Sequence, residues 1–173
     1  MSGGSLESIA TLTRRVARPG RIAWIGLRPG RRAEMRPVPR VYLGPSALEG
    51  DHAGGSKRAL TLIQSEHLPV IAALAGVVEV TPDMLRRNLV ISGINLLALR
   101  HRDLQIGTAL IRVTGPCAPC SRMEETLGPG GYSAVRGHGG LCASVLESGE
   151  IAIGDAVTSI GGQIGGEMAT TIG

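Results

Sequence analysis

Aromatic side chains are almost absent from this chain, whose 173 residues include no Phe, one Trp and two Tyr. The hydrophobic core must therefore be built from aliphatic side chains, chiefly Ile, Leu, Val and Ala. Proteins that bind single-stranded nucleic acids without sequence preference stack the bases on aromatic rings. The scarcity of such rings argues against a nucleic-acid partner.

Lysine is nearly missing as well, since Lys57 is the only lysine among the 18 basic residues and the others are all arginine. Residues 1–58 carry eleven basic against four acidic side chains, a net charge of +7, whereas residues 59–173 carry seven against ten, a net charge of −3. Because the planar guanidinium pairs well with phosphate and carboxylate groups, the basic N-terminal third favours an anionic ligand. A solvated arginine-rich surface would explain the same composition.

The sequence also lacks an export signal and a membrane-spanning run. Residues 1–20 contain Arg14, Arg15 and Arg18 but no apolar segment of the signal-peptide type. No apolar run elsewhere reaches the length that crosses a bilayer. The cysteine count is three, an odd number. We therefore expect free thiols in a reducing cytoplasm.

Long helical patterns are missing too, because 26 glycines and 10 prolines interrupt the apolar runs. The length suits one domain with one core. We expect a loosely ordered or weakly helical lead-in over residues 1–20, a domain over 21–157 and a flexible tail over 158–173.

Short apolar runs between turn residues predict about eight strands. These runs cover residues 21–27, 40–43, 58–63, 89–92, 104–106, 109–113, 141–146 and 151–157. The glycines of Ile106-Gly107 and Ile153-Gly154 indicate bulges or sharp bends, as a sheet needs where it curls. The predicted fold is mainly β, a β-barrel with short peripheral helices. A doubly wound sheet is disfavoured because long crossover helices are missing.

Two short helices are predicted before the middle of the chain. Ser65 is a suitable N-cap for a helix over residues 66–75, and Gly76 would end it. Thr81-Pro82-Asp83 predicts the start of a second helix, with proline at its first position. The apolar face of the first helix would comprise Leu68, Ile71, Ala72 and Ala75.

The most distinctive local pattern is Cys117-Ala118-Pro119-Cys120. It allows a redox pair of the thioredoxin kind, half of a zinc site completed by Cys142 and His138, or a single thiolate ligand for a soft transition metal. The βαβ context of a thioredoxin is absent, and the spacing to Cys142 and His138 fits no familiar zinc motif. Small buried side chains are the fourth interpretation.

Three further segments combine glycine or asparagine with cationic side chains. The loop from Gly50 to Arg58 suits an anion lying against the backbone, or is a polar loop without a ligand. Arg86-Arg87-Asn88 suits a phosphate or the edge of a polar heterocycle, or is an exposed helix end. Gly137-His138-Gly139-Gly140 indicates a backbone path closed to other residues, a ligand lying against the main chain, or a plain turn.

Taken in order, these blocks resemble the MOSC domain, named for the C-terminal domain of molybdenum-cofactor sulfurase, in its stand-alone bacterial form. The resemblance covers residues 21–157. It rests on the blocks Arg21-Ile22-Ala23-Trp24-Ile25, Gly50-Asp51-His52 to Arg58, Arg86 to Gly93, Ile106-Gly107, Gly115 to Cys120, Gly137 to Leu141 and Gly149 to Asp155.

The resemblance implies a β-barrel that binds the molybdenum cofactor, a pterin dithiolene carrying a phosphate. Cys120 matches the family's metal-coordinating cysteine, which makes it the expected metal ligand and catalytic residue. Cys117 is then an additional thiol at the cofactor, and the two cysteines are alternatives for the same role. Arg86 and Asn88 match the family's Arg-x-Asn contact to the cofactor, and Arg58 matches a basic position after the glycine-rich loop.

Two points limit the transfer of family roles. Bacterial members more often carry Gly-Asp-x-His, whereas His52 directly follows Asp51 here, so no family role is transferred to His52. Pyridoxal phosphate, which some family descriptions mention, would need a Schiff-base lysine. Lys57 is the only lysine in the chain, and we do not expect that cofactor.

The resemblance implies a reductase of N-hydroxylated small molecules, such as hydroxylamino purines. Electrons would come from a separate flavin or iron–sulfur protein, because no motif for either NADH or a cluster is present. One alternative is a sulfur carrier in which Cys120 holds a persulfide during metal-cofactor assembly. Another is a module that binds the cofactor without turnover.

Overall fold

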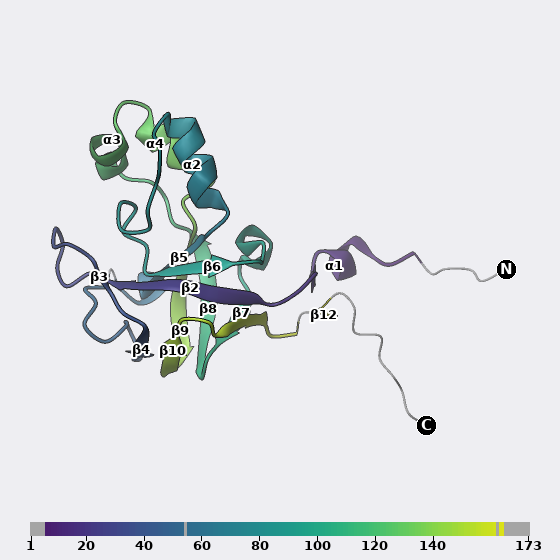
Figure 1. Ribbon diagram of the computed structural model, residues 1–173. Helices are drawn as coiled ribbons and strands as arrows, with labels where there is room; N and C mark the ends of the chain where they lie inside the picture. Colours follow the sequence, from purple (N-terminus) through teal and green to yellow (C-terminus); the bar gives the residue numbers. More distant parts are fainter. Residues whose placement is uncertain (1–5, 54, 162, 165–173) are drawn as a thin grey trace, which may run out of the picture.

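The computed structural model describes residues 6–53, 55–161 and 163–164 (Figure 1). The helices are α1 (Ile9–Leu12), α2 (His67–Ala75), α3 (Ser121–Leu127) and α4 (Gly131–Val135), with 3₁₀ turns η1 (Ser56–Arg58) and η2 (Leu96–Leu99). The strands are β1 (Arg15–Val16), β2 (Gly20–Leu27), β3 (Arg36–Pro37), β4 (Arg40–Leu43), β5 (Leu60–Gln64), β6 (Leu89–Ser92), β7 (Asp103–Ile106), β8 (Ala109–Pro116), β9 (Leu141–Glu147), β10 (Gly149–Ala152), β11 (Ala156–Ser159) and β12 (Gln163–Ile164).

The main sheet closes into a barrel. Its strands follow the order β11-β7-β8-β9-β5-β6-β2, and β11 pairs again with β2 to complete the circle. Neighbours in the barrel run antiparallel except β5 and β6, which are parallel and are connected through α2. The short strand β3 adds to the end of β2, and β4 pairs with β10 beside the barrel. The predicted β-barrel with short helices is thus confirmed.

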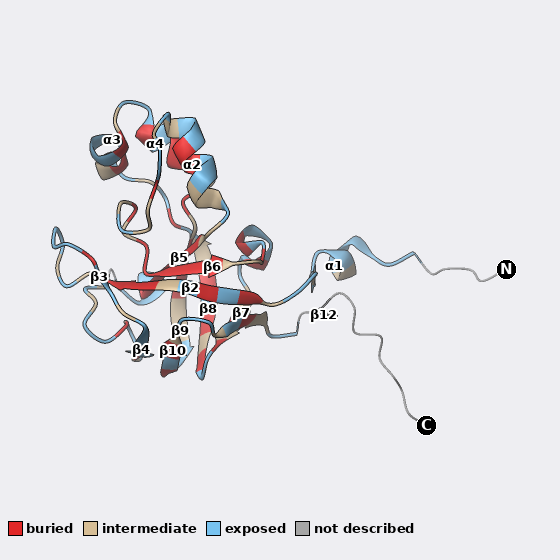
Figure 2. Cartoon of the chain, in the orientation of Figure 1, coloured by how far each residue is buried: buried red, intermediate tan, exposed pale blue. Residues whose placement is uncertain are grey.

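Strand alternation divides the buried side chains between two cores. On β5, Leu62 points into the barrel, whereas the next residue, Ile63, points outward to the helices. On β6, Ile91 faces the barrel and Val90 faces the helices in the same way. Figure 1 shows α2, α3 and α4 gathered at one end of the molecule, and Figure 2 shows the buried positions along the barrel strands. The helices therefore cover the outer face of β5 and β6.

The predicted strands are present with small shifts, except the last one. The predicted strand over residues 151–157 is two strands, β10 and β11, with a turn at Gly154 (φ 92°) between them. Gly107 (φ 55°) similarly forms the turn between β7 and β8, where an added Cβ would collide with the carbonyl oxygen of Glu150. Both glycines therefore reverse the chain rather than bend a strand.

The two helix predictions fare differently. The helix α2 ends at Gly76 in a left-handed conformation, as expected, and its apolar face packs on the second core. The predicted N-cap is wrong, because Ser65 donates its backbone N–H to Ile91 and the helix begins one residue later, after Glu66. The predicted helix at Thr81-Pro82-Asp83 is a turn over residues 82–86, which ends when Arg86 enters the left-handed region (φ 56°).

The ends of the domain lie side by side. Strand β1, within the predicted lead-in, pairs in parallel with β12, and β11 continues to Ser159. Paired strands thus occur on both sides of the predicted limits of 21 and 157. Residues 165–173 of the predicted tail lie outside the described residues. Within the described part of the chain, no helix has the length and apolar character needed to cross a membrane.

Candidate functional site

Three segments meet where the barrel adjoins the helical layer. They are the loop between β4 and β5, the turn over residues 82–88 that precedes β6, and the segment Cys117 to Cys120 that joins β8 to α3. Direct contacts connect them, because Asn88 bonds Asp51 in the loop and Arg58 approaches Cys117. Each segment carries residues that the sequence singled out, and the fold brings these residues to one place.

Asn88 holds the loop and the barrel together. Its side chain is fully buried, and its Oδ1 accepts hydrogen bonds from the Thr61 backbone N–H (3.2 Å) and the Thr61 hydroxyl (3.0 Å). Its Nδ2 donates to the carbonyl of Gly26 (3.1 Å) and to Oδ1 of Asp51 (3.1 Å). An aspartate could accept but not donate, so only an amide satisfies all four partners. Asn88 therefore connects strands β5 and β2 to the loop that carries Asp51.

Asp51 anchors the glycine-rich loop to the end of β2. Its carboxylate accepts from the Arg28 backbone N–H (2.6 Å) and from both Nε (3.2 Å) and Nη2 (2.8 Å) of the Arg28 guanidinium. The Asp51 side chain has no exposed surface, whereas Arg28 remains 14% exposed. A bidentate arginine–carboxylate pair fixes the orientation of both side chains in addition to neutralising their charges. The sequence had identified this aspartate only as part of a loop motif.

A cationic pocket opens above this network. It is lined by Arg28, Gly30, Arg31, His52, Arg58 and Arg86 and has a volume of about 360 Å³. We call it the arginine pocket. Arg86 donates to the carbonyls of Ala33 (2.5 Å) and Gly30 (2.9 Å), which fixes its guanidinium at the rim. Burial, followed by the positive charges of Arg122 and Arg28, lowers the pKa of Arg86. The pocket therefore holds an excess of positive charge that an anion would relieve.

A pair of buried thiols lies next to the arginine pocket. Cys117 is 3% exposed, and its backbone N–H donates to the carbonyl of Gly140 (2.9 Å), which brings it beside Cys142 on β9. A hydrogen bond from the Cys142 thiol lowers the pKa of Cys117 to about 6, with Arg87 and Arg58 adding to the effect against the opposing influence of burial. The same hydrogen bond, followed by burial, raises the pKa of Cys142. The pair thus holds one proton and one negative charge near neutral pH.

Two arginines face this negative charge. Arg58 Nη2 lies 3.8 Å from Sγ of Cys117, and the thiolate raises the pKa of Arg58. Arg87 is 5% exposed and donates to the carbonyls of Gly139 (2.6 Å) and Leu85 (2.6 Å). Its Nη2 has no partner within the described residues. A buried guanidinium without a carboxylate needs a counter-charge, and the thiolate of Cys117 is the nearby anion.

The predicted site residues did not include Arg28 and Arg31, which line the arginine pocket, or Arg87 and Cys142, which lie beside Cys117. The exposed-helix-end interpretation of the segment around Arg87 is wrong, because no helix forms there and Arg87, two residues before β6, is buried. Cys142 entered only as a candidate zinc ligand. Among the described residues, no three His, Cys, Asp or Glu side chains converge as a metal-binding set, so the zinc interpretation finds no support. All three cysteines are free.

Cys120 occupies a different environment from Cys117. It is exposed and is the residue before the first turn of α3, where its carbonyl accepts from the N–H of Met123 (2.9 Å). Two residues later, Arg122 Nη1 donates to the carbonyl of Arg31 (3.3 Å), which is a lining residue of the arginine pocket. The start of α3 therefore borders the pocket. One thiol of the motif is accessible and the other is acidic and buried.

The glycine segment before β9 has the close packing that its composition predicted. Gly140 (φ 89°) lies against β5, where an added Cβ would collide with the carbonyl oxygen of Leu62. An added Cβ on Gly139 would approach Cγ1 of Val135 to 2.8 Å. Between these contacts and α2, His138 stacks edge-to-face on His67, with ring centroids 5.4 Å apart. Burial, then the neighbouring His138, lowers the pKa of His67.

Comparison with known proteins shows the family of the chain and the proteins that share its fold. The profile of the MOSC domain matches residues 49–158, a range that includes Arg58, Arg86, Asn88 and both cysteines of the motif. No curated protein sequence matches the chain. The structure is similar to the YuaD protein from Bacillus subtilis, with a TM-score of 0.71 and 16% identity over 81% of this chain and 94% of that one.

Two further solved structures share the fold. YiiM from Geobacillus stearothermophilus has a TM-score of 0.69 and 23% identity, covering 82% of this chain and 75% of its own. YiiM from Escherichia coli has a TM-score of 0.64 and 22% identity, covering 80% of this chain and 69% of its own. The profile match spans more than half of the sequence. The chain belongs to the MOSC domain family.

Proposed function

We propose that this protein binds the molybdenum cofactor and reduces N-hydroxylated small molecules, hydroxylamino purines among them. The observation that carries the proposal is the combination of the arginine pocket with the thiols at its border. Four guanidinium groups line the pocket, and the buried carboxylate beneath it, on Asp51, is already paired with Arg28. A ligand with both a phosphate and a metal that accepts thiolate would use both features.

The residues present fit such a cofactor on three counts. Arg58 and Arg86 offer planar donors to a phosphate or to the polar edge of a pterin. The buried Arg87 keeps one N–H without a partner among the described residues, beside the thiols. Cys120 offers an exposed sulfur two residues before Arg122, which bonds the carbonyl of the pocket residue Arg31. When bound, the cofactor would supply two-electron redox chemistry with removal of oxygen from nitrogen.

The two cysteines of the motif have separate roles in this proposal. A metal ligand must be reachable from the pocket, and Cys120 is exposed whereas Cys117 is 3% exposed. Cys120 is therefore the proposed protein ligand to molybdenum. Cys117 is proposed to be a positioning residue. Its thiolate attracts Arg58 and Arg87 and so orients the Arg58 guanidinium, which lines the pocket.

The overall reaction balances as a two-electron reduction. The N–O bond of the hydroxylamine breaks, two electrons and two protons are taken up, and an amine and water are released. The proposal includes a separate flavin or iron–sulfur protein as the electron donor. The arginine pocket would favour substrates with a polar or anionic heterocycle, because its lining consists of guanidinium groups, an imidazole and a glycine.

The direct test is turnover by protein purified from molybdenum-replete cells. With a chemical reductant, the wild type should convert 6-hydroxylaminopurine to adenine, measured by chromatography. Cys120→Ser should lower the rate at least a hundredfold, whereas Arg40→Gln, an exposed arginine on β4 that does not line the pocket, should leave it unchanged. Stoichiometric molybdenum without any turnover of hydroxylamino substrates would refute the reductase. A persulfide on Cys120 without molybdenum would support the sulfur carrier instead.

A further inference from the structure

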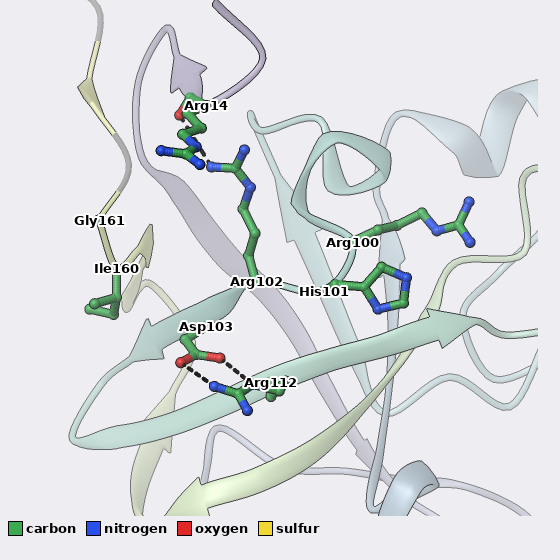
Figure 3. A pocket seen from close by; sticks show the side chains of 8 residues that line it. All are labelled: Arg14, Arg100, His101, Arg102, Asp103, Arg112, Ile160 and Gly161. Carbon is green, nitrogen blue, oxygen red and sulfur yellow. Dashed lines mark hydrogen bonds and ion pairs between the residues drawn. The ribbon is translucent and has the colours of Figure 1, made fainter. Parts of the chain in front are cut away.

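Figure 3 shows a second cationic pocket, between residues that precede β7, residues of β7 and β8, and residues that follow β11. It has a volume of about 430 Å³ and is lined by Arg14, Arg100, His101, Arg102, Asp103, Arg112, Ile160 and Gly161. We call it the distal basic pocket. None of these residues lines the arginine pocket. A ligand bound here would therefore be independent of the proposed cofactor.

The fold presents three consecutive basic residues at a tight turn. Arg100, His101 and Arg102 lie between η2 and β7, and His101 adopts a left-handed backbone conformation (φ 60°) that is unusual for a residue with a side chain. The turn is fixed on both sides. The N–H of Arg102 donates to the carbonyl of Leu99 (3.1 Å), and its own carbonyl accepts from Val113 on β8 (2.9 Å). Such a turn directs successive side chains apart around the cavity.

A further arginine comes from the N-terminal segment. Arg102 extends toward Arg14, as Figure 3 shows, and donates to the carbonyls of Thr13 (3.2 Å) and Arg14 (3.5 Å). These bonds hold the Arg102 guanidinium in place and bring Arg14 to the edge of the cavity. Two guanidinium groups are thus held near each other without a carboxylate between them. Like charges in such an arrangement repel, and an anion between them would remove the repulsion.

The acidic residue of the pocket does not balance these charges. Asp103 is engaged by Arg112 through bonds of 2.7 Å and 2.9 Å, and this bidentate contact lowers the pKa of Asp103. Within the part of the chain that the structure describes, no ion pair involves Arg14, Arg100 or Arg102. Three guanidinium groups around one cavity therefore retain their binding capacity for an anion.

We propose that the distal basic pocket binds a condensed phosphate, either as free diphosphate or as the diphosphate group of a nucleotide. Several phosphate oxygens at fixed spacing match several guanidinium forks better than a single carboxylate does. No Phe, Tyr or Trp lines the cavity, so recognition of stacked nucleic-acid bases is disfavoured. The cavity is also bounded by β7, β8 and the end of β11, which suits a small ligand better than a long polymer.

Calorimetric titration of the full chain with sodium pyrophosphate at low salt tests the proposal. Arg100→Gln is the informative variant, because no hydrogen bond of that side chain is part of the described fold, and affinity should fall about tenfold. Arg14→Gln should have a similar effect. The matched control Arg40→Gln, an exposed arginine outside both pockets, should bind like the wild type. Unchanged melting temperatures would show that the variants remain folded.

Three outcomes would overturn the proposal. The first is pyrophosphate binding that Arg100→Gln and Arg14→Gln leave unchanged. The second is binding lost equally in Arg31→Gln, which would move the site to the arginine pocket. The third is an affinity for a 20-nucleotide DNA that depends on Arg100 while pyrophosphate does not bind. Titration with ADP distinguishes the two sources of the ligand, because ADP binding tighter than pyrophosphate would indicate a nucleotide.

Discussion

The Nη2 atom of Arg58 lies 3.8 Å from Sγ of Cys117, so that a guanidinium lining the arginine pocket is the direct partner of a thiol buried beneath it. The thiolate raises the pKa of Arg58, and the arginine in turn helps to lower the pKa of Cys117. The charge of the buried Cys117 thiolate is thus coupled to the orientation of the Arg58 guanidinium in the pocket. The same coupling supplies the first predictions.

Titration of the thiols by ultraviolet absorbance should detect one early thiolate. In the wild type, absorbance near 240 nm should rise with a midpoint near pH 6, because the pKa of Cys117 is lowered to about 6. Cys117→Ser should abolish this step. Cys142→Ala should move it upward, because the hydrogen bond from Cys142 is the largest cause of the shift. A first midpoint near pH 9 in the wild type would contradict the buried thiolate.

Stability should depend on pH through the same group. Because the folded-state pKa of Cys117 is about 6 and its ordinary value is 9.0, the unfolded chain binds more protons between these pH values. The free energy of unfolding should therefore rise from pH 6 to pH 9. Above pH 9 the raised pKa of Cys142 should reverse the trend.

Urea unfolding of the wild type and Cys117→Ala at several pH values measures this contribution. The difference in unfolding free energy between the two proteins should grow between pH 6 and pH 9. An equal difference at all pH values would mean that Cys117 stabilises the fold by packing alone.

Asn88→Ala should destabilise the fold by about 2–4 kcal/mol, because it leaves buried groups of Thr61 and Gly26 without partners. It should also loosen Asp51 and, through it, Arg28. Asn95→Ala is the matched control, since that asparagine is exposed and caps only the short turn η2. Chemical denaturation compares the two. Equal costs for both substitutions would show that the buried amide network is not what holds the loop.

Alanine substitutions at two glycines of one segment should distinguish the cost of backbone strain from the cost of steric collision. Gly137 and Gly140 both have positive φ, at 81° and 89°, but only Gly140 packs against a carbonyl of β5. Gly137→Ala should cost about 1 kcal/mol from backbone strain alone. Gly140→Ala should cost more than about 3 kcal/mol or prevent folding, because the backbone of Leu62 cannot move aside. Thermal melting of both variants would reveal the difference, and similar melting temperatures would contradict it.

Much of the barrel was predictable because its strands are short apolar runs between turn residues. Residues 89–92 and 40–43 form strands at the predicted positions. The turn at residues 82–86 was not predictable, because a threonine–proline–aspartate sequence is equally compatible with a helix start and an isolated turn. In the folded chain the turn is favoured over a helix, because the Arg86 side chain donates to the carbonyls of Ala33 and Gly30, which are distant in sequence.

Some residues of the candidate site were named from the sequence, but their arrangement was not. Arg58, Arg86 and Asn88 were named from the order of the sequence blocks, and the fold brings them together. Their association with Arg28, Arg87 and Cys142 depends on which strands become neighbours, and no local pattern encodes that pairing. The difference between Cys117 and Cys120 has the same origin, since β9 buries one thiol and α3 leaves the other exposed. The role of Cys120 as metal ligand remains a prediction.

The most direct test of the proposed function is the molybdenum and pterin content per chain. Protein from molybdenum-replete cells should contain close to one cofactor per chain in the wild type and in Arg40→Gln. Cys120→Ser should lose most of the metal, and Arg58→Gln should lose most of the pterin and the metal together. Full occupancy in Cys120→Ser, or no cofactor in the wild type when a control protein from the same cells is loaded, would contradict the proposed site.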